Sequence, residues 1–291
     1  MLKSIKSKMI VIFSVLILLL MGISSLISFT QSRNILEETI YSAAEKSARQ
    51  NASLINERLT STKAELNALI HNPTIKSMDW TEQKSLLKTM VQETNKFEMM
   101  YIVDNNGNAH YTTGGSGDLS NREYFKEAMR SGEAVIAEPV KSKATGANVI
   151  PIVQPIFKDN SQNPIGLIGA TIKLEVFQKL VKDMDIRGHG YGWIINENKT
   201  TIAYPDEKYI GNKSLLDLSP QIQQIASQMV AGRSGKAEYE IEGEARELAY
   251  APIDSAGWSI ALTANKNDVL APLGIIQRSS LLIGIIGLVL G

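Results

Sequence analysis

The chain has 291 residues, with 30 lysines and arginines balanced by 30 aspartates and glutamates. A balanced charge provides no long-range field that would recruit nucleic acid or an acidic partner, so nucleic-acid binding is not expected. The sequence contains no cysteine, which excludes disulfides, thiolate zinc sites and cysteine nucleophiles. Stability must therefore come from buried apolar side chains, and a central region of about 250 residues is long enough to form two cores.

An apolar stretch lies close to the N-terminus. Residues 9–29 include no charged side chain, and a helix that crosses a bilayer needs about 20 such residues. Lys3, Lys6 and Lys8 precede it without an acidic residue, so residues 1–8 are expected in the cytoplasm and the middle of the chain outside it. The alternative is a cleaved signal peptide, but its apolar core would be only about 7 to 15 residues long. The length favours a retained transmembrane helix.

A second apolar stretch occupies residues 279–291, and it has about half the length of a membrane crossing. We expect it to be the truncated start of a second transmembrane helix. A cytoplasmic segment beyond it would contact the signalling partners.

The region after the first apolar stretch has the pattern of one long helix. Residues 31–70 contain no glycine or proline, and small or apolar side chains recur every three or four positions. About 40 helical residues would reach about 60 Å, far more than one small module needs. We therefore expect a stalk helix over residues 30–72 that ends at Asn72-Pro73. Its packed stripe consists of Ile40, Ala44, Ala48, Ala52, Ile55, Leu59 and Leu66.

After Pro73 the pattern changes to short strands and turns. Residues 99–104 and 109–113, separated by Asn105-Asn106-Gly107, predict a hairpin. Pro151 and Pro155 indicate an edge position or a bulge in the strand that carries them. The other expected strands cover residues 134–140, 149–157 and 165–174, and the expected short helices cover 123–130 and 175–183.

A weaker copy of this order follows about 91 to 97 residues later. Residues 193–196 repeat the pattern of 101–104, and residues 257–263 repeat that of 166–172. Residues 249–253 likewise repeat 152–156. The fold expected is α+β, with the long N-terminal helix followed by two tandem PAS-like modules built on antiparallel sheets and flanked by transmembrane helices. The membrane-distal module would span residues 73–184 and the membrane-proximal module residues 185–278.

Several segments resemble a known family. Residues 118–128 (DLSNREYFKEA) resemble the signature helix start of double Cache sensor domains, and Glu138-Pro139 with Thr145-Gly146 resembles the strand and hairpin that follow it. The resemblance extends over about residues 35–275 and includes segments 155–156, 166–174 and 202–206. The combination of these segments is similar to the extracytoplasmic half of bacterial methyl-accepting chemotaxis proteins. The same region also precedes histidine kinases and diguanylate cyclases, so these outputs stay open.

The resemblance implies a homodimeric receptor whose distal module binds a small molecule, commonly an amino acid or another carboxylate, and moves a transmembrane helix. Arg122 matches the arginine that grips the ligand carboxylate in amino-acid-binding members, and Tyr124 and Phe125 match the aromatic pair after it. Val140 and Ser142 replace a tyrosine and an aspartate of those members, and Thr171 replaces a later aspartate. An organic acid without an amine is therefore at least as plausible a ligand.

Tyr101, Tyr111 and Ser142 are further candidates for the pocket. The alternative for Arg122 is a surface arginine that caps or braces its helix, with Ser120 and Glu123 forming a capping box under either interpretation.

No enzymatic activity, metal or cofactor is expected. The histidines are His71, His110 and His189, and none has metal-ligand spacing. A membrane-anchored structural protein or adhesin is the other class that remains open, and a pocket that binds no small molecule would favour it.

Overall fold

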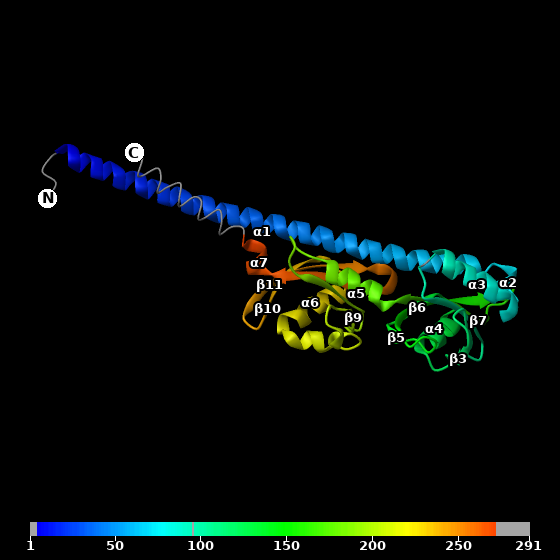
Figure 1. Ribbon diagram of the computed structural model, residues 1–291. Helices are drawn as coiled ribbons and strands as arrows, with labels where there is room; N and C mark the ends of the chain where they lie inside the picture. Colours follow the sequence, from blue (N-terminus) through cyan, green and yellow to red (C-terminus); the bar gives the residue numbers. More distant parts are fainter. Residues whose placement is uncertain (1–4, 95, 272–291) are drawn as a thin grey trace.

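The computed structural model describes residues 5–94 and 96–271. One long helix runs along the molecule, and two sheet modules lie one after the other on the same side of it (Figure 1). The expected second membrane segment, residues 279–291, lies outside the described residues.

Helix α1 (Ile5–Leu69) is continuous over 65 residues. All seven residues of its predicted stripe are buried at 3% exposure or less, which confirms the packed face. Toward the N-terminus the helix has a different surface, since Phe13, Leu20 and Leu26 are each more than half exposed. It is the one helix in the described part of the chain that is long and apolar enough to cross a membrane.

The distal tip is helical, so the expectation of only strands and turns after Pro73 is wrong there. Asn72 caps the short helix α2 (Pro73–Lys76) by accepting a hydrogen bond from Thr74 N at 2.9 Å. Helix α3 (Trp80–Thr94) follows and buries Gln83 and Leu87. These two residues are four apart and therefore lie on one helix face.

The distal sheet is antiparallel, in the order β3-β2-β1-β7-β6-β4, with β5 also paired to β6. Helix α4 covers its outer face and α1 its inner face (Figure 1). The elements are β1 (Met99–Asp104), β2 (Asn108–Tyr111), β3 (Ser116–Asp118), α4 (Glu123–Ser131), β4 (Val135–Ile136), β5 (Val140–Lys141), β6 (Asn148–Phe157), β7 (Pro164–Lys173) and α5 (Leu174–Asp183).

The strand expected over residues 134–140 is split into β4 and β5. Pro139 lies at the break and has no N–H to donate to a ladder. Strand β6 pairs with β7 along one side and with β5 and β4 at residues 148–149 and 152–153 of the other side, so the expected edge position is wrong, whereas the alternative of a bulge fits the irregular pairing near Pro155. Beyond β4, however, Pro155 faces no described strand on the outer side, and the pairing with β7 shifts between Ile156 and Phe157.

The proximal sheet repeats this plan in the order β10-β11-β12-β8-β9. The register between the central strands is also the same in both sheets. Ile102 of β1 faces Ile168 of β7 in the distal sheet, and Ile194 of β8 faces Ile260 of β12 in the proximal sheet. The internal repeat is therefore confirmed. The elements are β8 (Tyr191–Ile195), β9 (Thr201–Ala203), η1 (Glu207–Tyr209), η2 (Ser214–Leu218), α6 (Pro220–Val230), β10 (Gly235–Ile241), β11 (Glu244–Ile253), η3 (Asp254–Ala256), β12 (Trp258–Asn265) and α7 (Lys266–Leu270).

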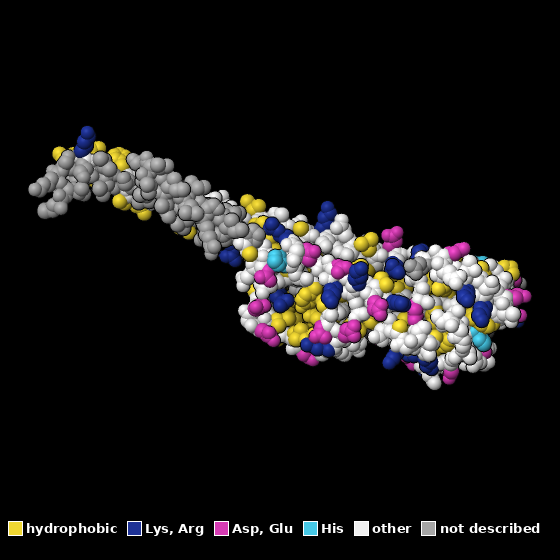
Figure 2. Space-filling model, in the orientation of Figure 1, with side chains coloured by type: hydrophobic (Ala, Val, Ile, Leu, Met, Phe, Trp, Pro, Cys, Tyr) yellow, Lys and Arg dark blue, Asp and Glu magenta, His cyan; other side chains and the backbone are white. Residues whose placement is uncertain are grey.

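Each sheet divides its side chains between two cores. In β1, Met100 and Ile102 face the core on α1, while Tyr101 and Val103 face the core under α4. This alternation follows from the two-residue period of a strand. The α1 core is continuous through both sheets, so the long helix joins the modules mechanically. On the visible surface of both modules, basic and acidic side chains are interspersed (Figure 2).

Candidate functional site

A small cavity of about 20 Å³ lies on the outer face of the distal sheet, between the sheet, the start of α4 and the hairpin of residues 140–147. Six of the seven predicted site residues line it: Tyr101, Tyr111, Arg122, Tyr124, Ser142 and Thr171. The seventh, Phe125, is absent from this lining and is 7% exposed in the apolar cluster under α4. Val140, which replaces the family tyrosine, also lines the cavity.

Arg122 is the N-cap residue of α4, but its side chain makes no cap hydrogen bond. The expected capping box is wrong, because Ser120 precedes the cap and its N–H donates to Asp118 Oδ1 at 2.8 Å. The extended backbone of Arg122 instead directs the guanidinium across to β5, where Nη2 donates to Lys141 O at 2.9 Å. Its Nε is buried and has no hydrogen-bond partner among the described residues.

Two tyrosine hydroxyls are also buried without a partner in the described structure, those of Tyr101 and Tyr111. Their rings meet edge to face at 6.1 Å. Burial raises the pKa of Tyr101 well above its usual value, and the neighbouring Tyr124 adds to the effect. Burial also raises the pKa of Tyr111 and Tyr124, with Arg122 opposing it. The three phenols are therefore neutral hydrogen-bond donors near neutral pH.

The hairpin over the cavity is held down by basic side chains. Lys143 Nζ donates to Asp118 O, and Arg122 donates to Lys141 O. Ser142 closes the hairpin, since its N–H donates to Ala147 O at 2.8 Å. Arg122, Lys141 and Lys143 line the cavity, and no described aspartate or glutamate does. The site is positive and rich in donors, which suits an anion.

One carboxylate that the sequence reasoning missed lies directly behind the cavity wall. Glu98 precedes β1, and its Oε2 accepts a hydrogen bond from Thr171 Oγ1 at 2.8 Å. Its Oε1 accepts from Thr145 Oγ1 on the hairpin. The backbone also joins the two elements, because Glu98 N donates to Thr171 O at 2.8 Å. No local sequence pattern marked Glu98, because its neighbour Met99 meets Thr171 only through the pairing of β1 with β7.

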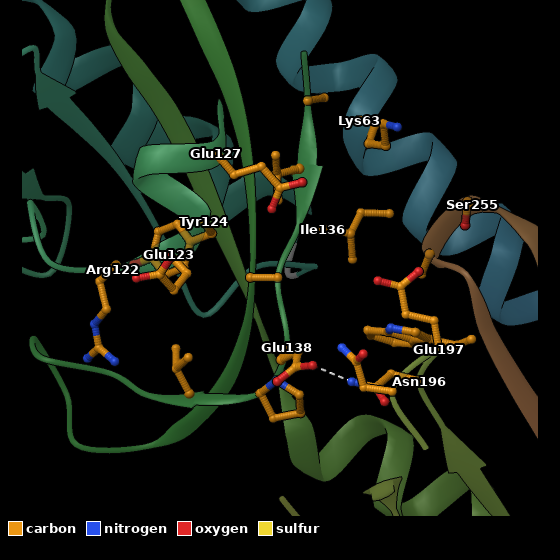
Figure 3. A pocket seen from close by; sticks show the side chains of 18 of the residues that line it. Lys63, Arg122, Glu123, Tyr124, Glu127, Ile136, Glu138, Asn196, Glu197 and Ser255 are labelled. Atoms are coloured by element: carbon orange, nitrogen blue, oxygen red, sulfur yellow. Dashed lines mark hydrogen bonds between the residues drawn. The ribbon is translucent and has the colours of Figure 1, made fainter. Parts of the chain in front are cut away.

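A larger cavity of about 680 Å³ lies between the modules. Figure 3 shows Lys63 from α1, Glu127 from α4 and Glu197 from the proximal module around it. Asn196 Nδ2 donates to Glu138 Oε1 and so bridges the modules. No group of three His, Cys, Asp or Glu side chains in the described residues is placed to hold a metal ion.

A buried carboxylate lies where α1 meets the proximal module. Glu247 is 1% exposed, and neither of its carboxylate oxygens has a partner within the described ranges. Burial raises its pKa; Glu238 and Glu37 add to this effect, and Lys266 opposes it. Lys266 Nζ lies 3.7 Å from Glu37 Oε1 of α1 and also contacts Glu238, which accepts from Tyr41 Oη at 2.6 Å.

The Cache domain family model matches residues 32–273. The chain belongs to the Cache domain family. Its relatives include the methyl-accepting chemotaxis proteins TlpA and TlpB of Bacillus subtilis, at 26% and 24% identity over 66% and 99% of this chain. These matches cover 29% and 43% of the relatives. The chain thus spans less than half of their length.

Solved structures share the fold. The ligand-binding domain of the Pseudomonas aeruginosa amino acid chemoreceptor PctB, in complex with L-Arg, has a TM-score of 0.66 at 20% identity, over 80% of this chain and 98% of that one. The Pseudomonas fluorescens CtaA domain with L-leucine has a TM-score of 0.66 at 21% identity, over 81% and 99%. The extracellular domain of mmHK1S-Z2, described as a histidine kinase, gives 0.64 at 17% identity, over 81% and 99%. At these identities the matches show that the chain shares the fold of these domains.

Proposed function

We propose that this Cache region is the extracytoplasmic sensor of a transmembrane chemoreceptor and that its distal module, residues 73–184, binds a small carboxylate at Arg122. Residues 9–29 would span the membrane, with residues 279–291 beginning a second span after the proximal module, residues 185–278. Chemotaxis is the favoured output because the relatives are named as chemotaxis receptors. The similarity to a histidine kinase domain keeps a kinase output as the alternative.

The observation that carries this proposal is a set of three buried donors around one cavity that have no hydrogen-bond partner among the described residues: Arg122 Nε, Tyr101 Oη and Tyr111 Oη. A buried donor left unpaired costs about 1–3 kcal/mol. A carboxylate accepts at about four lone-pair sites and would satisfy these donors together. Lys141 and Lys143 in the same lining add favourable charge.

A cavity of about 20 Å³ has room for about one water molecule. A ligand must therefore open the hairpin of residues 140–147, exchanging the contact of Arg122 with Lys141 O for its own. The open and closed forms would then differ in ligand affinity, as any ligand-driven shift requires. A shift transmitted through α1 or α7 would move the membrane helices of a homodimer against each other and reach the cytoplasmic partners.

The proposal is tested with the full chain in nanodiscs. Trp80, Trp193 and Trp258, the three tryptophans of the sequence, all lie outside the apolar segments, so intrinsic fluorescence follows unfolding of the sensor modules. Amino acids, organic acids and purines are screened for a rise in Tm, and the affinity of each hit is measured for Arg122→Ala. The matched control is Arg130→Ala, an exposed arginine of the same helix.

Arg122→Ala should remain folded, because the side chain makes one hydrogen bond to a backbone oxygen. Hydrogen bonds to charged groups are worth about 1.5–3 kcal/mol, so carboxylate affinity should fall about tenfold to a hundredfold. Arg130→Ala should bind like the native chain. A carboxylate that stabilises both variants equally, or a screen in which only uncharged compounds bind, would refute the site.

A further inference from the structure

We propose that Glu98 makes this site selective for a ligand that carries a protonated amine beside its carboxylate, through the hydroxyl of Thr171. This inference rests on the carboxylate site proposed at Arg122. It assigns a role to a residue that lies outside the cavity lining but controls one wall of it.

The direction of the hydrogen bond between Thr171 and Glu98 determines what the Thr171 hydroxyl can do in the cavity. Thr171 is 2% exposed, and its Oγ1 lies 2.8 Å from Glu98 Oε2. A carboxylate only accepts, so the single hydroxyl proton of Thr171 is donated to Glu98. The oxygen lone pairs of Thr171 are then free to accept from a group in the cavity. Glu98 thereby turns the Thr171 hydroxyl into a fixed acceptor.

The position of Glu98 is well determined by its contacts. The backbone bond from Glu98 N to Thr171 O, at 2.8 Å, fixes the residue against β7. The second carboxylate oxygen accepts from Thr145 Oγ1, and Thr145 N donates to Ser142 Oγ at 3.3 Å. Ser142 also lines the cavity. Two hydroxyl groups of the cavity wall are therefore connected to this carboxylate. That of Thr171 bonds to it directly, and that of Ser142 is connected to it through Thr145.

The site consequently has two poles. Arg122, Lys141 and Lys143 line the cavity with positive charge, and the wall of Thr171 is backed by the one carboxylate bonded to it. A simple organic acid would interact only with the positively charged side chains. An ammonium group next to the ligand carboxylate would donate to Thr171 Oγ1 and gain from the charge of Glu98 behind it.

Glu98 also joins the hairpin to the sheet through Thr145, and a purely structural role must be distinguished from selectivity. Removing a structural contact would change the affinity for every ligand alike, because each ligand must open the same hairpin. Removing the charge that orients Thr171 would weaken only ligands with an amine. The two roles therefore differ in their effect on one ratio, the affinity for an amino acid divided by the affinity for the same acid without the amine.

The test uses the full chain in nanodiscs and matched ligand pairs: the standard L-amino acids and the same acids without the amine, such as L-leucine and 4-methylpentanoate. The native chain should bind the amino acid of the active pair about tenfold to a hundredfold more tightly. Glu98→Gln and Thr171→Val should remove most of this preference, because the amino acid should lose far more affinity than the amine-free acid. Thr145→Val breaks only the hairpin contact, so it should keep the preference. Glu93→Gln, an exposed glutamate of α3, is the surface control.

Equal affinity of the native chain for both members of every pair would overturn the inference, and this comparison needs no variant to fold. So would Glu98→Gln weakening both members equally, or Thr145→Val abolishing the preference. In each of these cases, dependence of binding on Arg122 would leave the proposed carboxylate sensor intact. Failure of the native chain to bind any carboxylate would instead refute the proposed function, and this inference with it.

Discussion

Gly169 of β7 lies under the Tyr101 ring and offers a test of the cavity that leaves Arg122 untouched. The two residues face each other in adjacent strands. A Cβ placed on Gly169 would lie 2.6 Å from Tyr101 Oη and within 2.5 Å of two ring carbons, Cζ and Cε2. Tyr101 is 1% exposed within a packed core, so the ring has room to move only toward the cavity. Gly169→Ala should therefore displace the phenol into the ligand site.

Overpacking of this kind costs about 1–3 kcal/mol. For a region of this size, each kcal/mol lowers Tm by about 2–4 °C, so Gly169→Ala should lower it by about 2–12 °C. The displaced hydroxyl should also reduce carboxylate affinity about tenfold, the value of one hydrogen bond to a charged group. Tryptophan fluorescence gives the Tm, and calorimetric titration in nanodiscs gives the affinity.

The matched control is Gly166→Ala in the same strand, where the added Cβ meets Met78 Cε at 2.6 Å and the backbone of β1. That variant should lose stability, but the ligand affinity of its folded fraction should be unchanged. Unchanged Tm and affinity in Gly169→Ala would show that Tyr101 does not pack on Gly169 and that the cavity is formed differently.

Three further outcomes are expected. Because burial raises the pKa of Glu247, the native state holds that proton more tightly than the unfolded chain, and stability should fall as pH rises from the ordinary glutamate range through the raised value. Glu247→Gln should flatten this part of the Tm profile; an unaltered profile would contradict this. Asn196→Ala should lower Tm more than Glu138→Ala, because Asn196 also accepts from Thr200 N at 2.8 Å; equal losses in the two variants would argue against this. A reporter enzyme active only outside the cytoplasm should be active when fused near residue 150, and activity of a cytoplasmic reporter there would end the receptor interpretation.

The sequence by itself determined the features that depend on local periodicity. The buried stripe of α1 repeats with the helical period, so residues from Ile40 to Leu66 could be assigned to one face without a partner in view. The repeat of strands was also readable, because β1 and β8 carry the same apolar pattern at a constant offset. Length and hydropathy alone predict a membrane span at residues 9–29.

Pairings between distant segments were decided only by the tertiary structure. Whether residues 134–140 form one strand depends on the partner β6 and on Pro139, which interrupts the ladder. The N-cap of α4 is Arg122 rather than Ser120, which lies in the preceding turn, where its N–H donates to Asp118 Oδ1. Glu98 and Thr171 are 73 positions apart, and no local pattern links them. The register between β1 and β7 brings them together, so the carboxylate behind the cavity wall could be found only once the sheet was formed.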